Sequence, residues 1–311
     1  MSSSAVLSNQ VGLIRYGMSI VLILGVIGNA FFIILFRRRR QNSCAIYLSG
    51  SALLNSLALV LAIPMNVYNV NHQDPTDYSL FLCKSWHYFG HVWGQIARYL
   101  TAFACIDRFV LTTNNPRCQI ILCPKLARKI TIITIIANHI FLIHVVILTT
   151  IRNGQCRQFG VYYLLYQVQV LVIIALIPLL LMLIFGYFTY RNVRQLYTRI
   201  QPIQTGTNQR IANTVHHRRD RDLLTMVLIE VLIYALTMFW YPFILLEIAI
   251  TTHIGISKSI EHIQIESLLS TIATLFIYIN SSISFYLYLI VSKPFRKDFK
   301  DLIIHMMRMV Y

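Results

Sequence analysis

Seven apolar runs, each long enough to cross a bilayer as a helix, dominate this sequence. A spanning helix needs about 20 residues, and lipid offers no hydrogen-bond partners to a backbone that is not helical. The chain is 57% hydrophobic and only 12% charged, which is too apolar for a soluble domain of 311 residues. We therefore expect an all-α membrane protein, a seven-transmembrane helix bundle, with helices at residues 11–36, 46–70, 84–113, 130–151, 161–190, 223–251 and 263–290.

Basic residues predict how the bundle is oriented. Of the 27 Lys and Arg, 20 lie in the connections after the first, third and fifth runs and in the tail, which the positive-inside bias makes cytoplasmic. Residues 1–10 then form an extracellular N-terminus, residues 11–291 the transmembrane domain, and residues 292–311 a cytoplasmic amphipathic helix and tail. Because the net charge of +16 gathers on one membrane face, it predicts contact with membrane lipids and a cytoplasmic partner rather than with nucleic acid.

The third run carries the most specific motif, with Cys83 near its outer end and Asp107-Arg108-Phe109 at its inner end. Gly28-Asn29 in the first run and Phe239-Trp240-Tyr241-Pro242 in the sixth add two further patterns. Together these motifs resemble the rhodopsin-like class of G-protein-coupled receptors, and the resemblance covers essentially the whole chain. No phosphate-binding loop, metalloprotease motif or nucleophile elbow is found, so we expect no enzyme activity and no cofactor.

The resemblance implies roles for the motif residues. Asp107 holds Arg108 in the resting state, and the released Arg108 caps the C-terminal helix of a heterotrimeric G protein. Pro242 kinks the sixth helix, because proline removes a backbone hydrogen bond, and Trp240 packs beneath the ligand. Gly28 lets helices approach closely, and the amide of Asn29 hydrogen-bonds across the bundle.

Two departures from the family pattern bear on the switch. Asn55 stands where relatives carry an aspartate that, with a serine, holds sodium, and Ala97 stands at the place of that serine. A sodium site is therefore not expected; Asn55 is either a switch residue or an interhelical hydrogen-bond donor. The family's Asn-Pro pair on helix seven is replaced by Ser284-Phe285, whereas its tyrosine is retained as Tyr288.

Residues 293–299 look like the amphipathic eighth helix of the family, with Phe295 seven residues after Tyr288. Cys83 and Cys156 both fall on the predicted outer side, where oxidation is allowed, and we expect a disulfide between them. The other cysteines, at positions 44, 105, 118 and 123, are expected to stay reduced.

Polar residues inside the bundle suggest where a ligand binds. Gly90 occupies the position at which amine receptors place an aspartate, which weighs against a biogenic amine. Arg98 lies near mid-membrane and needs a partner, for which Asn55, Glu230, Asn138 and carbonyls near Pro178 are all options. His87 and His91 are four residues apart, but no further ligands accompany them, so we assign no metal. The expected ligand-binding residues are His91, Gln167, Trp240, Tyr241 and Glu247.

The sequence thus predicts a plasma-membrane receptor that binds an extracellular ligand and activates a heterotrimeric G protein. The motifs around the seventh and eighth helices are most similar to invertebrate neuropeptide receptors of the FMRFamide-receptor kind, which implies a peptide ligand. Alternatives are a receptor-like protein that no longer couples, a non-peptide chemosensory receptor, and a transporter or channel in which Arg98 and buried histidines line a permeation path.

Overall fold

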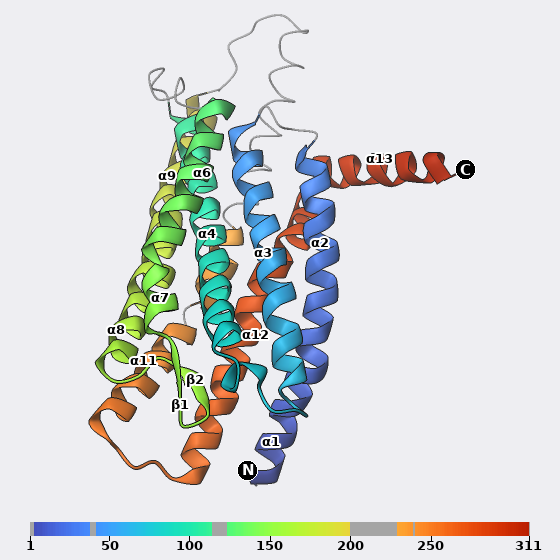
Figure 1. The fold of residues 1–311 in the computed structure, drawn as a ribbon. Helices are drawn as coiled ribbons and strands as arrows, with labels where there is room; N and C mark the ends of the chain where they lie inside the picture. Colours follow the sequence, from blue (N-terminus) through green and yellow to red (C-terminus); the bar gives the residue numbers. More distant parts are fainter. Residues whose placement is uncertain (1–2, 38–41, 114–122, 200–228, 239, 311) are drawn as a thin grey trace, which may run out of the picture.

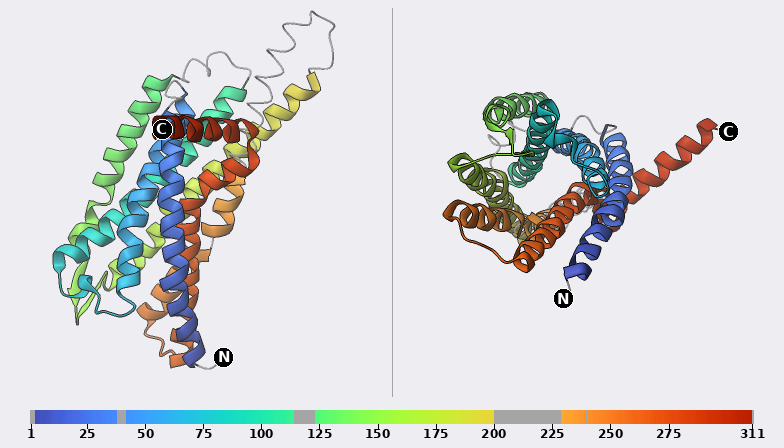
Figure 2. Two further views of the ribbon diagram at one scale, coloured as in Figure 1. Left: turned by 90° about the vertical axis from the view of Figure 1, so that its right-hand side faces the viewer. Right: turned by 60° about the horizontal axis from the view of Figure 1, so that its bottom comes forward.

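A computed structural model describes the chain except residues 1–2, 38–41, 114–122, 200–228, 239 and 311. Long helices run side by side as a bundle that, seen from one end, forms a ring (Figures 1 and 2). The elements along the bundle are α1 (Ser3–Gly12), the π-helical η1 (Leu13–Met18), α2 (Ser19–Arg37), α3 (Ser43–Tyr68), α4 (Leu80–Thr112), α6 (Pro124–Phe141), α7 (Ile143–Leu148), α8 (Val161–Gln169), the π-helical η3 (Val170–Leu176), α9 (Ile177–Arg199), α11 (Trp240–Ile254) and α12 (Ile260–Val291). Helix six is the run Ile229–Ile254, of which α11 is the C-terminal part.

Within the described residues, six helices are long and apolar enough to span a membrane. The predicted third span, α4, is not among them, although its 33 residues extend about 50 Å. This helix packs against α3, α6 and α9, so its polar side chains meet protein rather than lipid. Large apolar side chains such as Ile133 and Ile290 are exposed on the outside of the bundle, as expected where lipid is the solvent. The fold class is confirmed: an all-α membrane protein.

The structure corrects two predicted helix boundaries. The first helix begins at Ser3, so most of the stretch interpreted as a polar lead is helical. The fourth helix ends at Leu148 rather than Ile151, and the strands β1 (Thr150–Arg152) and β2 (Gln155–Arg157) follow. The start of the predicted sixth run, residues 223–228, and the cysteine at position 118 lie outside the described residues.

Small residues let the first helix approach its neighbours. A Cβ atom at Gly25 would come within 2.6 Å of Leu59 Cδ1, and one at Gly28 within 2.9 Å of Tyr286 Cε2. The contact continues through Asn29, whose amide Nδ2 donates to the carbonyl oxygen of Ser281 at 3.1 Å. The predicted interhelical hydrogen bond of Asn29 is therefore confirmed.

The end of the bundle that carries the N-terminus, which we call the outer end after its predicted orientation, carries a short hairpin tied to α4. Antiparallel pairing sets Ile151 opposite Cys156, and the turn residues Asn153 and Gly154 have φ values of 52° and 67°, as a two-residue type I′ turn requires. The Cys83–Cys156 disulfide is present, which confirms its prediction. The backbone N–H of Cys156 also donates to Asp77 Oδ1 at 2.7 Å. The hairpin is thus held from two sides.

At the opposite end, α13 (Lys293–Val310) leaves the bundle at a steep angle (Figure 1). Its buried Phe295 packs its ring against Phe32, Phe36 and Tyr288. The Arg296 guanidinium donates to the last carbonyls of α12. The helix predicted at residues 293–299 is present and continues well beyond them.

Candidate functional site

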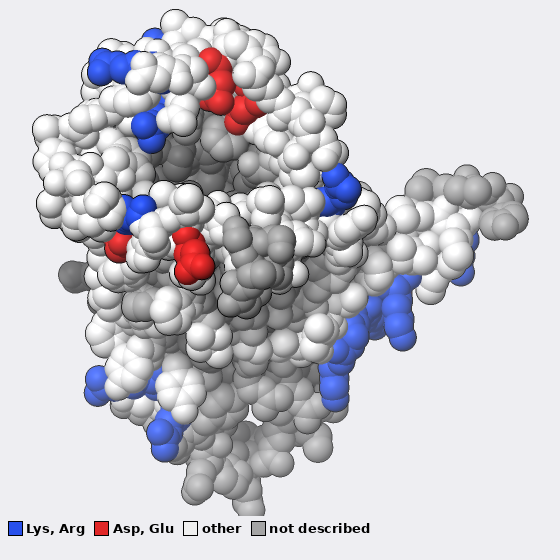
Figure 3. All heavy atoms as spheres, turned by 90° about the horizontal axis from the view of Figure 1, so that it is seen from below, with Lys and Arg blue, Asp and Glu red and all other residues white. Residues whose placement is uncertain are grey.

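A central cavity of about 130 Å³ lies among α3, α4, η3, helix six and α12. The end of the molecule that carries the N-terminus and the hairpin is hollowed, with acidic and basic side chains around the rim (Figure 3). The cavity wall is mostly apolar and aromatic, as ligand pockets usually are. Its lining residues are Ala58, Leu59, Ala62, Trp86, Gly90, His91, Gly94, Arg98, Val170, Ile174, Ala175, Met238, Tyr241, Pro242, Thr274, Ile277, Tyr278 and Ser281.

Two of the five predicted ligand-binding residues, His91 and Tyr241, line this cavity. Gln167 is buried away from it, and Glu247 lies at the rim of the outer end with 49% of its side chain exposed. Trp240 is 57% exposed, so it does not lie beneath the cavity as expected. The reason is rotation: one residue turns a side chain by about 100° around the helix axis, and here Tyr241 takes the inward direction.

The π-helical segment η3 connects the cavity wall to two neighbouring helices. A π-helix displaces the usual backbone pairing and leaves carbonyls available to other donors. The hydroxyl of Tyr99 on α4 donates to the Ile173 carbonyl at 3.0 Å, and that of Tyr234 on helix six donates to the Ile174 carbonyl at 3.3 Å. These bonds connect the middle of helix five to α4 and helix six.

A second, polar chamber of about 20 Å³ lies on the side of the central cavity that faces α13, and we call it the inner chamber. Arg98 lines both spaces, as do Met238 and Ser281, and these three residues separate the two spaces. Asn55, a predicted switch residue, also lines the inner chamber. The remaining lining residues are Ser51, Ala97, Thr101, Glu230, Tyr234, Met238, Asn280, Ser281 and Ser284.

Glu230 joins helix six to α12 across this chamber. The hydroxyl of Ser284 donates to Glu230 Oε1 at 2.9 Å, and that of Tyr288 donates to Oε2 at 3.2 Å. From the sequence alone, Glu230 is one of several possible partners of Arg98. In the structure its carboxyl group instead accepts hydrogen bonds from two hydroxyl groups. An acid in an apolar run marks a functional position, and that signal was present in the sequence, but it does not name the partner.

The predicted pair of Asp107 and Arg108 forms an ion pair at 2.9 Å, with both side chains buried. Asp107 also accepts a short hydrogen bond from the Ser43 hydroxyl, and Arg108 donates to Asn42 Oδ1 at 2.8 Å. The carboxylate and the guanidinium are therefore both attached to the start of α3. Beside them, Phe109 packs against two rings of α9, those of Phe185 and Phe188.

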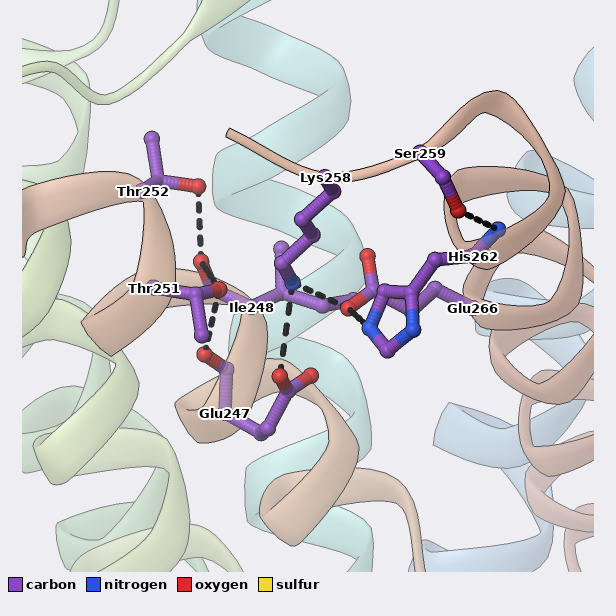
Figure 4. Close-up of polar contacts among 8 residues, drawn as sticks. All are labelled: Glu247, Ile248, Thr251, Thr252, Lys258, Ser259, His262 and Glu266. Carbon is purple, nitrogen blue, oxygen red and sulfur yellow. Dashed lines mark hydrogen bonds and ion pairs between the residues drawn. The ribbon is translucent and has the colours of Figure 1, made fainter. Parts of the chain in front are cut away.

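A cluster of charged residues joins the end of helix six to the start of α12 (Figure 4). It consists of Glu247, Lys258, His262 and Glu266. Lys258 donates to Glu247 at 3.3 Å and, over a short distance, to Glu266, which also contacts His262 at 3.0 Å. Partial burial lowers the pKa of Lys258, but the hydrogen bonds to Glu266 and Glu247 raise it by more, so its net shift is upward. Glu247, His262 and Glu266 lie close enough to share a metal ion, but the Lys258 ammonium already supplies the cation.

The model of the family 7 transmembrane receptor (rhodopsin family) matches residues 28–288, which is most of the chain. No curated protein matches the sequence. The matched region contains the cavity, the inner chamber and the Asp107–Arg108 pair. Members of this family are membrane receptors that signal through G proteins, and they are not enzymes. On this match, the chain belongs to the rhodopsin family of seven-transmembrane receptors.

Proposed function

We propose that this receptor acts at the plasma membrane, binds a neuropeptide on its outer side and activates a heterotrimeric G protein on its inner side. One observation carries the proposal: α4 lines the central cavity with His91 and holds the Asp107–Arg108 pair four turns further along. A ligand in the cavity and a G protein at the pair would then bias one helix bundle between two states. The N-terminus is extracellular and the tail cytoplasmic in this proposal, in agreement with the charge distribution.

Features of the outer end favour a peptide ligand. The rim offers separate acidic and basic groups, whereas the cavity beneath it is apolar and aromatic, so a chain with several different side chains finds a complement to each. Gly90 removes the acid that a small amine would need. At the rim, Glu247 accepts a hydrogen bond from Lys258 and remains half exposed, so we propose that it contacts a basic group of the peptide.

The test is agonist-dependent GTPγS binding in membranes that contain the receptor, a panel of G proteins and a neuropeptide library. Arg108→Ala is expected to abolish the peptide response, while Arg15→Ala, which removes an arginine on the outer side bonded to Asn71, serves as the matched control. Glu247→Gln is expected to weaken the response to basic peptides. Receptor at the cell surface that stays silent with every peptide would refute the proposal and favour an uncoupled receptor-like protein.

A further inference from the structure

The floor of the central cavity presents a positive charge. Arg98 lies on the inner side of the cavity, and a Cβ atom at Gly94 would be 3.4 Å from each terminal nitrogen of its guanidinium. The side chain therefore turns back over Gly94, one turn toward the outer end of α4. A Cβ atom at Gly90, a further turn outward, would meet nothing within 4 Å. Since Arg98 lines the cavity beside two glycines that have no side chain to cover it, its guanidinium faces the cavity.

Within the described part of the chain, no carboxylate forms an ion pair with Arg98. The residues that line the cavity include no Asp or Glu. The acid of the inner chamber, Glu230, accepts hydrogen bonds from Ser284 and Tyr288, and no ion pair joins it to Arg98. A cation at this depth is costly unless it is paired, because the surroundings are poor in water. This arrangement is that of a binding site in which a bound ligand supplies the anion.

We propose that Arg98 binds a carboxylate of the ligand. This inference rests on the proposed function and specifies its ligand: a peptide that inserts its free C-terminal carboxylate to the floor of the cavity. A guanidinium presents its N–H donors as a planar fork, which matches the two oxygens of a carboxylate. The aromatic walls formed by Trp86, Tyr241 and Tyr278 can pack against the side chain that adjoins that carboxylate. A volume of about 130 Å³ suits the end of a peptide rather than its whole length.

The proposal is tested first without knowing the natural ligand, by using benzoate and benzamide as probes. The two molecules have nearly the same shape, but only benzoate is charged. Purified full-length receptor is titrated with each probe in a chloride-free buffer, and its melting temperature is recorded. Benzoate is expected to stabilise the wild-type protein at concentrations roughly tenfold to a hundredfold below those that benzamide needs, as for a hydrogen bond to a charged group.

Arg98→Gln is expected to remove the difference between the probes, whereas Arg98→Lys, which keeps the charge but loses the fork, retains part of it. Each variant is compared with itself without probe, because removal of a buried charge changes the melting temperature on its own. Equal effects of benzoate and benzamide on wild type, or no effect of either, would overturn the proposal. So would benzoate stabilisation that appears only in Glu230→Gln, because Arg98 would then be paired with Glu230.

A second experiment separates this inference from the proposed function and identifies the source of the carboxylate. The GTPγS assay is run with each library peptide in two forms, one with a free C-terminal carboxylate and one amidated, and with small organic acids as a third arm. A response confined to free acids and lost in Arg98→Gln supports the inference, and the arm that responds tells whether a peptide or a small acid supplies the carboxylate. Equal responses to both peptide forms keep the peptide receptor but refute the role of Arg98.

Discussion

Replacing Glu230 by glutamine should raise the activity of the receptor in the absence of ligand. In the structure the Glu230 carboxyl group accepts one hydrogen bond from the Ser284 hydroxyl and one from the Tyr288 hydroxyl, and so holds helix six to α12. The Asp107–Arg108 pair is closed at the same time, as we expect of the resting state. Any contact that exists only in the resting state stabilises that state, and its loss shifts the population toward the active one.

The size of the shift follows from the hydrogen bonds. Glutamine keeps one carbonyl acceptor, so Glu230→Gln loses about one hydrogen bond, worth about 1 kcal/mol, and the ratio of active to resting receptor should rise about fivefold. Glu230→Ala loses both bonds, worth about 2–3 kcal/mol, which corresponds to a rise of roughly 30- to 150-fold. The larger effect of alanine is part of the prediction.

Basal GTPγS binding without ligand, normalised to receptor at the cell surface, measures this shift. Glu261→Gln makes the same chemical change at an exposed acid in the first turn of α12 and should leave basal activity unaltered. Unchanged or reduced basal exchange in both Glu230 variants, with normal surface expression, would show that the contact is not specific to the resting state. The reasoning from the inner chamber would then fail.

Three further perturbations test other parts of the structure. Cys83→Ala with Cys156→Ala opens a crosslink that spans 73 residues, which by the chain-entropy model should cost about 4 kcal/mol and lower the melting temperature; an unchanged value would contradict it. Ser43→Ala removes the hydroxyl that holds Asp107 and should raise basal exchange roughly fivefold, whereas unaltered exchange would place the switch elsewhere. Since the pKa of Lys258 is raised above 10.5, its stabilising contribution is complete below that value and is lost as the pH rises through the higher folded-state value. The difference in melting temperature between wild type and Lys258→Met should therefore stay constant from about pH 7 to 9, and a decline within that range would refute the shift.

The sequence predicts the bundle well because lipid leaves the backbone few choices. Long apolar runs specify helices, and the Gly28-Asn29 pair finds its contacts on α12 as expected. The apolar pattern does not indicate the hairpin after helix four, because residues 130–151 form one continuous apolar run. Asn153-Gly154, a dipeptide typical of two-residue hairpin turns, was the signal that could have found it.

Side-chain direction was harder to predict than helix position. The spacing to Pro242 fixes how far along helix six Trp240 lies, but not which way the helix is turned about its axis. In the structure Tyr241, and not Trp240, lines the cavity. Partners were harder still. Charge in an apolar run marks Arg98 and Glu230 as important, yet only the packed bundle shows that they do not bind each other.

The crosslink between α4 and the hairpin also constrains how the receptor is made. Cys156 follows Cys83 by 73 residues, so at a synthesis rate of about 5–20 residues per second the second thiol leaves the ribosome about 4–15 s after the first. In the proposed orientation both thiols must reach the same oxidising lumen, and α6 and α7 must have crossed the membrane before they can meet. Closure of the crosslink therefore reports that the third and fourth spans are inserted as a pair with both cysteines in that lumen, which gives the secretory pathway a chemical record of this part of the topology.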